Sequence, residues 1–307
     1  MSNSKFIAAT LLIPLFLSTN LSTVSADTFT DVREGHAYYT AIVHLKEKNI
    51  ISGYDDGSFK PNQQINRSEA LKMLTLASGV FKDSLPKPKE APFTDTPLGE
   101  WYTEYLAAAK DKHIINGYDD GSFKPESPIN LAEALKIYFE AVNSVNENTI
   151  NFEDSFNTTF IDTPPDSWYI QYTNYAGSRD LINIYEDNTI NPHQIMTRGY
   201  LAEIIYRTMQ DHEGFDFGKA TYYFGIPGKI KENYNYDEEL MVTAHKTLPF
   251  GTILEVTNMA NGKSVKVKVT DRGPYGYGRV LDLSKKAFAK LASPSVGIIT
   301  VQYHEYH

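Results

Sequence analysis

The amino-acid sequence predicts a multidomain fold in which all-α helix-loop-helix repeats are followed by a small closed β-barrel at the C-terminus. Two observations carry this prediction. One stretch of the chain recurs after 64 residues with nearly the same letters, as in repeat proteins whose units bury their apolar faces against one another. From Lys219 onward, alternation of apolar and polar residues replaces the helical spacing and indicates β-strands. A length of 307 residues allows more than one domain.

Composition narrows the class of protein. With 41% hydrophobic and 22% charged residues, the chain is globular. The absence of cysteine excludes disulfides, thiolate metal sites and a cysteine nucleophile. Residues 217–307 carry 12 basic and 8 acidic side chains, a net charge of +4, whereas residues 27–216 carry 16 and 30, a net charge of −14. This split indicates domains that meet different partners, and the basic domain suits an anionic polymer.

Residues 1–26 predict a secretory signal peptide. Lys5 precedes an apolar stretch at 6–17, and the small residues Val24 and Ala26 suit cleavage before Asp27. The stretch has 12 residues and contains a proline, so it is shorter than a membrane span of about 20 residues. An uncleaved anchor is the alternative. We expect a secreted mature chain without an integral membrane span.

Three segments follow the same order of motifs: 27–80, 90–143 and a degenerate third at 157–210. In the first two, Gly-Tyr-Asp-Asp-Gly predicts a turn between two helices. Tyr38, Ala41, Ile42 and Leu45 have the spacing of the first helix, and the second repeat has the same spacing. The second helix begins with a capping-box pattern, Asn66 with Glu69 and Asn130 with Glu133.

This pattern resembles the S-layer homology module, which usually occurs in threes. The resemblance implies that grooves between repeats clasp an anionic secondary cell-wall polysaccharide. It places polymer-binding roles on the arginine that opens the second helix and on the basic residue before the loop proline: Arg67, Arg198, Lys60 and Lys124. Arg67 as a solvated helix-start residue is the alternative. Leu131 replaces the arginine in the second repeat, and Tyr200 replaces the motif's glutamate in the third.

The C-terminal part predicts its elements in turn. Residues 253–257 form a strand, Asn261-Gly262 a hairpin turn, and Val265, Val267 and Val269 the core-facing positions of the next strand. A short helix follows from Ser284 to residue 291, with Ser284 as its N-cap. Residues 298–301 supply the last strand. About ninety residues with several short strands and one helix indicate a closed barrel.

The motifs at 220–223, 243–252, 271–275 and 278–284 resemble the rare lipoprotein A family, related to expansins. The resemblance spans about residues 219–303, within a C-terminal domain predicted at 217–307, and implies a six-stranded double-psi β-barrel. Active members cut the MurNAc–GlcNAc bond of peptidoglycan and close a 1,6-anhydro ring, so the expected partners are peptidoglycan glycan strands. The sugar's own 6-hydroxyl is the nucleophile, so a single carboxyl can act as acid and then as base.

The family's pattern implies catalytic and substrate-binding roles for specific residues. Asp271, at a strand end before a Gly-Pro turn, is the expected acid, with a raised pKa required. Its alternative is a turn-capping aspartate. His245 matches the family's groove histidine and is either an orienting residue or a buried structural one. The substrate-binding candidates are Thr221, Tyr275, Asp282 and Arg272. Asp282 is also placed to cap the following helix.

One departure weakens the prediction of an enzyme. Active relatives place a glutamate eleven residues before the groove histidine, where this chain has Tyr234. Glu232, two residues upstream, is the candidate substitute. A non-catalytic, expansin-like glycan-binding or wall-loosening module and a structural S-layer component therefore remain alternatives. No motif indicates a cofactor, a metal site or a nucleic-acid partner.

Overall fold

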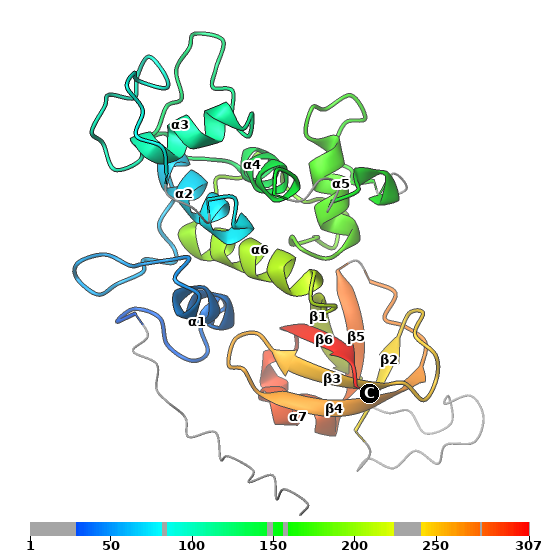
Figure 1. Cartoon of the computed structure of the whole chain (residues 1–307). Helices are drawn as coiled ribbons and strands as arrows, with labels where there is room; N and C mark the ends of the chain where they lie inside the picture. The colour runs from blue at the N-terminus through cyan, green and yellow to red at the C-terminus, as the bar shows by residue number, and fades with distance from the viewer. Residues whose placement is uncertain are drawn as a thin grey trace, which may run out of the picture.

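The computed structural model describes residues 29–81, 85–145, 150–155, 159–223, 241–276 and 278–306. The predicted signal peptide lies outside this range. The helices gather into one body, and the β-barrel lies below it with the C-terminal end of α6 directed towards the barrel (Figure 1). Among the described residues, no helix is both long and apolar enough to cross a membrane.

Six α-helices make up the first body, as the sequence predicts. They are α1 (Tyr39–Glu47), α2 (Arg67–Ser78), α3 (Thr103–Asp111), α4 (Leu131–Asn143), α5 (Ile170–Ser178) and α6 (Arg198–Asp211), with a 3₁₀ turn, η1 (Phe152–Ser155), before α5. Both predicted capping boxes are formed: the side chains of Asn66 and Asn130 accept from the backbone N–H three residues later. Thr197 caps α6 in the same way, but Tyr200 cannot return the second bond.

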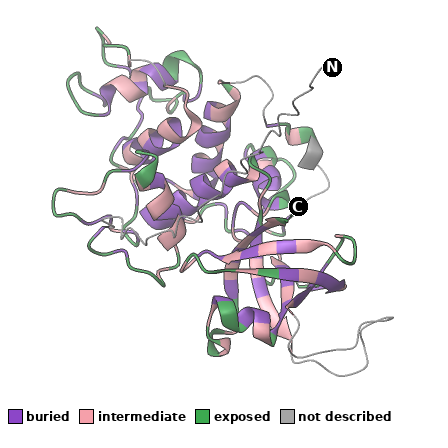
Figure 2. Ribbon diagram, turned by 60° about the horizontal axis from the view of Figure 1, so that its bottom comes forward, coloured by how far each residue is buried: buried purple, intermediate pink, exposed green. Residues whose placement is uncertain are grey.

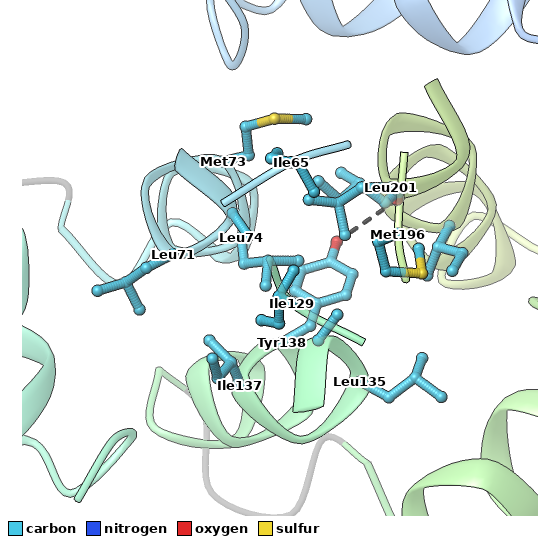
Figure 3. Packing of buried hydrophobic residues seen from close by; sticks show 14 of the residues in the cluster. Ile65, Leu71, Met73, Leu74, Ile129, Leu135, Ile137, Tyr138, Met196 and Leu201 are labelled. Atoms are coloured by element: carbon cyan, nitrogen blue, oxygen red, sulfur yellow. Dashed lines mark hydrogen bonds between the residues drawn. The ribbon is translucent and has the colours of Figure 1, made fainter. Parts of the chain in front are cut away.

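The second helices of the three segments, α2, α4 and α6, form the centre of the helical body. Figure 3 shows Tyr138 among the buried side chains of these helices, with its hydroxyl donating to the carbonyl oxygen of Ile205 at 3.4 Å. The strand-like segments before the helices pair cyclically through the bridges Gln64–Thr197, Asn66–Pro128 and Asn130–Ile195. The three segments therefore close into a ring with approximate threefold symmetry.

The Phe-x-Asp motif holds the loop before each second helix. The carboxylate of Asp31 accepts from the backbone N–H groups of Phe59 and Lys60 at 2.8 and 2.7 Å. Asp95 and Asp162 make the same contacts in the second and third segments. The clamped residue is left-handed in all three, with φ of 58°, 58° and 52° at Lys60, Lys124 and Asn191. The third segment thus keeps the geometry although it has lost the Gly-Asp letters.

The second body is the predicted closed six-stranded barrel. Its strands are β1 (Asp216–Tyr223), β2 (Val242–His245), β3 (Ile253–Asn258), β4 (Ser264–Asp271), β5 (Arg279–Ser284) and β6 (Ile299–Glu305), in the order β1-β5-β2-β4-β3-β6. The pairs β1–β5 and β2–β4 are parallel and the others antiparallel. The first strand begins three residues earlier than the sequence pattern predicts, because Asp216 already pairs with Tyr303.

Side-chain alternation fills the barrel as predicted. Val267 and Val269 are buried, together with Leu281, Leu283 and Phe288, whereas Val265 is only half-buried near the hairpin. Figure 2 shows buried and less buried positions alternating along the strands. The helix α7 (Lys285–Leu291) begins at Ser284, whose side chain accepts from the N–H of Ala287 and confirms the predicted cap.

Candidate functional site

Four strands place the candidate residues of the barrel side by side. Asp271 of β4 is paired with Ala244 of β2, which is paired with Asp282 of β5, which is paired with Thr221 of β1. Paired residues on neighbouring strands share one face of a sheet. The neighbours of Asp282 in β5, Leu281 and Leu283, point into the core. The four side chains therefore lie on the outside of the barrel; we call them the acidic face.

Asp282 is the perturbed carboxyl of the acidic face. Burial raises its pKa, and the negative charge of Asp271 acts in the same direction. The hydroxyl of Thr221, which donates to Asp282 Oδ1 at 2.9 Å, and the cation of Arg279 oppose this rise. Asp282 does not cap α7, because Ser284 holds that position. The hydrogen-bond partner of Asp282 is instead Thr221, a second candidate residue from the sequence.

Asp271 is a half-buried residue at the end of β4. Its Oδ1 accepts from the backbone N–H of Arg272 at 2.7 Å. Two strand steps separate it from Asp282, which corresponds to a Cα separation of roughly 10 Å at about 4.8 Å per step. The small side chain of Ala244 lies between the two carboxyls. Ala244 is itself buried, with 5% of the residue exposed, whereas both carboxyls are half-buried.

His245 is not part of the acidic face. It follows Ala244 in β2, so its side chain points to the opposite side of the strand, and only 8% of the residue is exposed. Nδ1 accepts from the N–H groups of Thr247 and Leu248 at 3.2 and 2.9 Å, and Nε2 lies 3.1 Å from the hydroxyl of Tyr303. Burial lowers the pKa of its imidazole. Both ring nitrogens of His245 thus have partners within the fold, as the buried structural alternative requires, and its predicted catalytic role stays a prediction.

Arg272 is also turned away from the acidic face. Its Nη1 donates to the carbonyl oxygen of Leu248 at 2.9 Å and lies 3.4 Å from that of His245. Its guanidinium lies 3.8 Å from the ring centroid of Phe250. These contacts tie Arg272 to the loop after β2, and its predicted substrate-binding role stays a prediction.

Two aromatic side chains are available at this end of the barrel. Tyr275, in the loop after β4, is 86% exposed, and Phe250 is 53% exposed. Exposed rings of this size favour sugar stacking, and Tyr275 keeps its predicted substrate-binding role as a candidate. Glu232 and Tyr234 lie outside the described residues. Within the described residues, no cluster of three or more His, Asp or Glu side chains could hold a metal.

Two of the cavities among the described residues of the helical body, of about 170 and 310 Å³, lie at equivalent places. We call them the first and second pockets. Each is built from the loop and second helix of one segment, the tryptophan that precedes the next segment's first helix, and an arginine from the remaining segment. The polar and aromatic lining residues of the first pocket are Tyr54, Glu69, Lys72, Trp101 and Arg198. Those of the second are Tyr118, Glu133, Lys136, Trp168 and Arg67.

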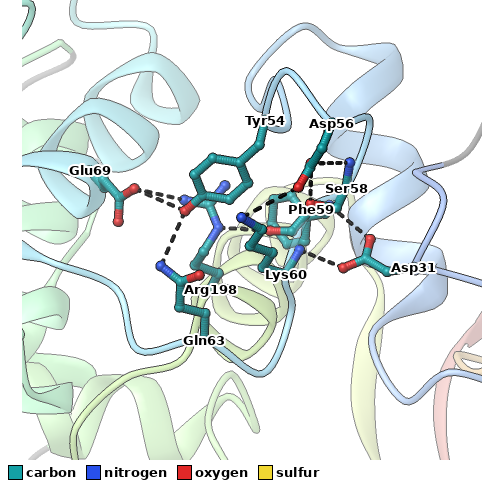
Figure 4. A network of polar contacts seen from close by, with 9 residues as sticks. All are labelled: Asp31, Tyr54, Asp56, Ser58, Phe59, Lys60, Gln63, Glu69 and Arg198. Atoms are coloured by element: carbon teal, nitrogen blue, oxygen red, sulfur yellow. Dashed lines mark hydrogen bonds and ion pairs between the residues drawn. The ribbon is translucent and has the colours of Figure 1, made fainter.

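The two arginines are buried joints between segments rather than solvated side chains. Figure 4 shows Arg198 beneath Tyr54, with Nη1 at 3.3 Å from Glu69 Oε1 and Nε donating to the carbonyl oxygen of Phe59 at 2.8 Å. Arg67 repeats this arrangement, 3.1 Å from Glu133 and donating to Phe123 at 2.9 Å. The alternative of a solvated Arg67 is wrong, because only 9% of its side chain is exposed.

The predicted lysines lie beside the pockets and do not line them. Lys60 pairs with Asp56 at 3.5 Å and lies 4.2 Å above the ring of Tyr54. Lys124 lies at 4.1 Å above the equivalent ring, that of Tyr118. The ring of each pocket tyrosine therefore contacts both a lysine and an arginine.

The lining residues Lys72, Lys136, Trp101 and Trp168 were not predicted from the sequence. The ammonium of Lys72 lies 5.5 Å from the ring of Trp101, and that of Lys136 lies 5.6 Å from Trp168. Because a glutamate compensates the arginine in each pocket, these lysines give the pockets their net positive charge. The recurrence of the lysine after 64 residues and of the tryptophan after 67 residues was the signal available in the sequence.

Comparisons with known protein families agree with this division. Residues 217–303 match the family described as "Lytic transglycolase", and residues 28–71 and 92–135 match the S-layer homology domain. The chain combines two S-layer homology repeats with an RlpA-like barrel. The third segment lies outside these matches, so a third, divergent repeat stays a prediction, which the contacts of Asp162 support.

Relatives match one part of the chain at a time. The barrel is similar to "Endolytic peptidoglycan transglycosylase RlpA" of Vibrio cholerae, 41% identical over 100 residues, covering 32% of this chain and 38% of that protein. A probable RlpA of Treponema pallidum is 44% identical over 70 residues, 23% of this chain and 22% of that one. A "Cellulosome-anchoring protein" of Acetivibrio thermocellus is 31% identical over 117 residues, 37% and 25% of the two chains.

The chain therefore spans less than two-fifths of the length of these curated relatives. Among solved structures, apo-Clavibacter michiganensis expansin is 27% identical, with 30% of this chain and 50% of that chain covered and a TM-score of 0.26. A TM-score this low adds nothing to the fold assignment.

Proposed function

We propose that this chain is a cell-wall-associated peptidoglycan transglycosylase, held at its substrate by the helical repeats. The observation that carries the catalytic part is the acidic face, where Asp271 of β4 and Asp282 of β5 lie on either side of Ala244 of β2. Two carboxyls on one outer face of the barrel, next to the loop that carries the exposed ring of Tyr275, suit a glycan strand that lies across the surface. The similarity to RlpA proteins named as endolytic peptidoglycan transglycosylases supports the same reaction.

The reaction requires one carboxyl that acts twice. In its protonated form, Asp271 donates its proton to the glycosidic oxygen as the bond from C1 of MurNAc breaks, so GlcNAc leaves as an alcohol. The 6-hydroxyl of the same MurNAc attacks C1 and gives its proton to the carboxylate. The 1,6-anhydro ring is closed and the acid is restored. No water is consumed, which removes the need for the second carboxylate of a hydrolase.

Asp282 is the second candidate for this acid. Burial raises its pKa, which is the property that a general acid at neutral pH requires. Thr221, 2.9 Å away, is able to orient its proton towards a bound glycan. We keep Asp271 as the acid and assign Asp282 with Thr221 to substrate binding, since Asp271 ends β4 and stands directly before the loop that carries the exposed Tyr275.

Anchoring rests on the first and second pockets. Each combines a net positive charge with an exposed tryptophan at its rim, and this pairing suits an acidic polysaccharide, because the ring covers a sugar face while the lysine meets the acid. We therefore propose that the ligand is an anionic secondary cell-wall polysaccharide and that the chain is located at the cell wall.

The test of the enzyme is product analysis with the mature chain, residues 27–307, on purified peptidoglycan. Wild type is expected to release anhydro-muropeptides that are detectable by mass spectrometry. Asp271→Asn should lower the rate by about 10²–10⁴ while co-sedimentation with peptidoglycan is retained. Glu232→Gln is the companion variant, since loss of activity there would show that Glu232 replaces the glutamate missing at Tyr234. Circular dichroism confirms that each variant is folded.

A wild-type chain that sediments with peptidoglycan but never yields anhydro products would contradict the proposed reaction. It would favour the second candidate function, a non-catalytic expansin-like module. Tyr234 at the family's glutamate position is the observation that favours this alternative. Activity lost in Asp282→Asn but kept in Asp271→Asn would exchange the roles of the two acids.

A further inference from the structure

The ring of three segments has a third position equivalent to the first and second pockets. By the same construction it is bounded by the loop of the third segment, helix α6, the start of α1 and the start of α4. At the other two positions an arginine, a glutamate, a lysine, a tryptophan and a loop glycine come together. At the third position these five residues are replaced by Leu131, Tyr200, Glu203, Ala37 and Ile184, respectively.

These replacements fill the third position with side chains. The ring of Tyr200 stacks on that of Tyr38 at 6.3 Å, and its hydroxyl accepts from the N–H of Asn183 at 2.9 Å. Glu203, which replaces the pocket lysine, is buried and pairs with Arg207 at 2.9 Å. The cation, the rim tryptophan and the open floor are therefore all replaced at the position where a third polymer would bind.

The barrel lies against the outside of this third position. Gly278 passes so close to the loop that a Cβ on it would lie 2.8 Å from the carbonyl oxygen of Ile184. Arg279 pairs with Glu186 of the same loop at 3.1 Å. On α6, the hydroxyl of Tyr206 donates to Gln302 of β6 at 2.6 Å. The contacts thus come from two barrel segments, the start of β5 and β6, and meet both the loop and the second helix of the third segment.

A small apolar cluster completes the contact and belongs to neither core. It consists of Ala41 of α1, Tyr206 of α6, Phe217 of β1 and Met259 of the β3–β4 hairpin, all buried. Ala41 stands where the second and third segments have tyrosines at 105 and 172, so the first segment has a small residue where Met259 packs. Beside the cluster, the N–H groups of Gly35 and Thr40 donate to hairpin carbonyls at 2.7 and 3.3 Å.

We propose that the third inter-repeat position is a docking surface for this chain's own barrel, in place of a third polymer pocket. The occupant is fixed by the shape and charge of the contacts: a small residue opposite Met259, a glycine opposite Ile184 and an acid opposite Arg279. The consequence is a chain with two polymer pockets and a barrel held in one orientation relative to them.

The test is hydrogen exchange of the Gly35 and Thr40 amides in the mature chain, followed by NMR. Docking predicts that both exchange at least tenfold slower than unprotected amides. Met259→Asp places a charge in the apolar cluster and should speed both at least tenfold, while the amides of β4 and α4 stay protected. Lys263→Asp, at an exposed position of the same hairpin, is the matched control and should change neither.

Ala41→Glu places a charge in the same cluster from the helical body. If Met259→Asp disturbs the barrel, exchange of the Gly35 and Thr40 amides in Ala41→Glu tests the docking instead. Unprotected Gly35 and Thr40 amides in the wild type would overturn the proposal. The proposal would also be overturned if the Gly35 and Thr40 amides were as well protected in both Met259→Asp and Ala41→Glu as in the wild type.

A second arm adds soluble polysaccharide released from purified cell wall, and it rests on the proposed function. Slower exchange or shifted resonances are expected at the first and second pockets and not at residues 183–185. A response at residues 183–185 would overturn the docking surface. A response at none of the three positions would count against polymer binding alone, since the first arm still decides docking.

Discussion

At the residue scale, the basic side chains that line the two pockets differ in how firmly they are tied into the fold. Arg67 joins two segments through Glu133, the carbonyl oxygen of Phe123 and two aromatic rings. Lys136 lies at the same pocket, near Trp168. Removing the arginine leaves a half-buried glutamate without its cation, whereas removing the lysine leaves no buried group unpaired. The two substitutions should therefore differ in stability and agree in binding.

We predict that Arg67→Ala lowers the free energy of unfolding by about 2–3 kcal/mol, measured by urea denaturation. Lys136→Ala should stay within about 0.5 kcal/mol of wild type. Both should weaken co-sedimentation with purified cell wall, by about 10–100-fold in affinity for each lost charge-assisted contact. Lys112→Ala, an exposed lysine of the same segment, is the control. If folded Lys136→Ala binds the cell wall as well as the wild type does, the second pocket does not bind the polymer.

Asp180 gives a prediction about pH. Burial raises its pKa to about 6, from an ordinary value of 3.8, and Arg207 and Lys246 only partly oppose this. The folded chain thus holds this proton more tightly than the unfolded chain. The contribution of Asp180 to stability is therefore most favourable below about pH 4 and is lost as the pH rises to about 6.

Asp180→Asn should remove that loss, because the amide does not ionise. Asparagine also suits the left-handed backbone at this residue, where φ is 54°, and the first segment has Asn49 at the equivalent place. We expect a gain of about 1–2 kcal/mol at pH 7 and none at pH 4, measured by thermal unfolding at both pH values. An equal gain at both pH values would trace the effect to the backbone instead.

At the scale of elements, the loop clamp is the most regular device of the helical body. Asp95 holds two backbone N–H groups and with them the left-handed turn at Lys124. We predict that Asp95→Ala lowers the free energy of unfolding by about 1.5–3 kcal/mol, the value of hydrogen bonds to a charged acceptor. Asp119→Ala, in the exposed turn of the same loop, should change it by less than about 0.5 kcal/mol. Equal effects would mean that the clamp is dispensable.

Elements fixed by neighbouring residues were predictable from the sequence. The capping boxes at Asn66 and Asn130, the cap at Ser284 and the hairpin at Asn261-Gly262 depend on spacings of two or three residues. The pockets were not predictable in full, because each needs three segments at once. Arg198 reaches a carbonyl 139 residues away, and no local pattern specifies that distance.

The acidic face shows the same limit. The resemblance named Asp271, Asp282 and Thr221, and the strand register brings them together. It also named His245 and Arg272, whose side chains turn to the loop after β2. A sequence motif records that a residue is needed but not which side of a strand it faces. The one-residue register shift between Thr243 and Ala244 decides that here.

At the scale of the whole molecule, the central claim is that anchoring and cleavage belong to one chain. The negative helical part carries pockets with local positive charge, and the positive barrel carries an acidic face, so the proposed binding site of each body is opposite in charge to its average. Docking of the barrel on the third segment would keep the two kinds of site in a fixed relation.

The most direct measurement compares two preparations of cell wall as substrates: intact wall, and wall from which the anionic polysaccharide has been extracted. Release of anhydro-muropeptides by the mature chain is followed by mass spectrometry, with Asp271→Asn as the blank and soluble glycan strands as the reference substrate. The account predicts release at least tenfold faster from intact wall, and this advantage should disappear in a Lys72→Ala and Lys136→Ala double variant that cuts soluble strands normally. Equal rates on both walls, or no anhydro products from any substrate, would contradict it.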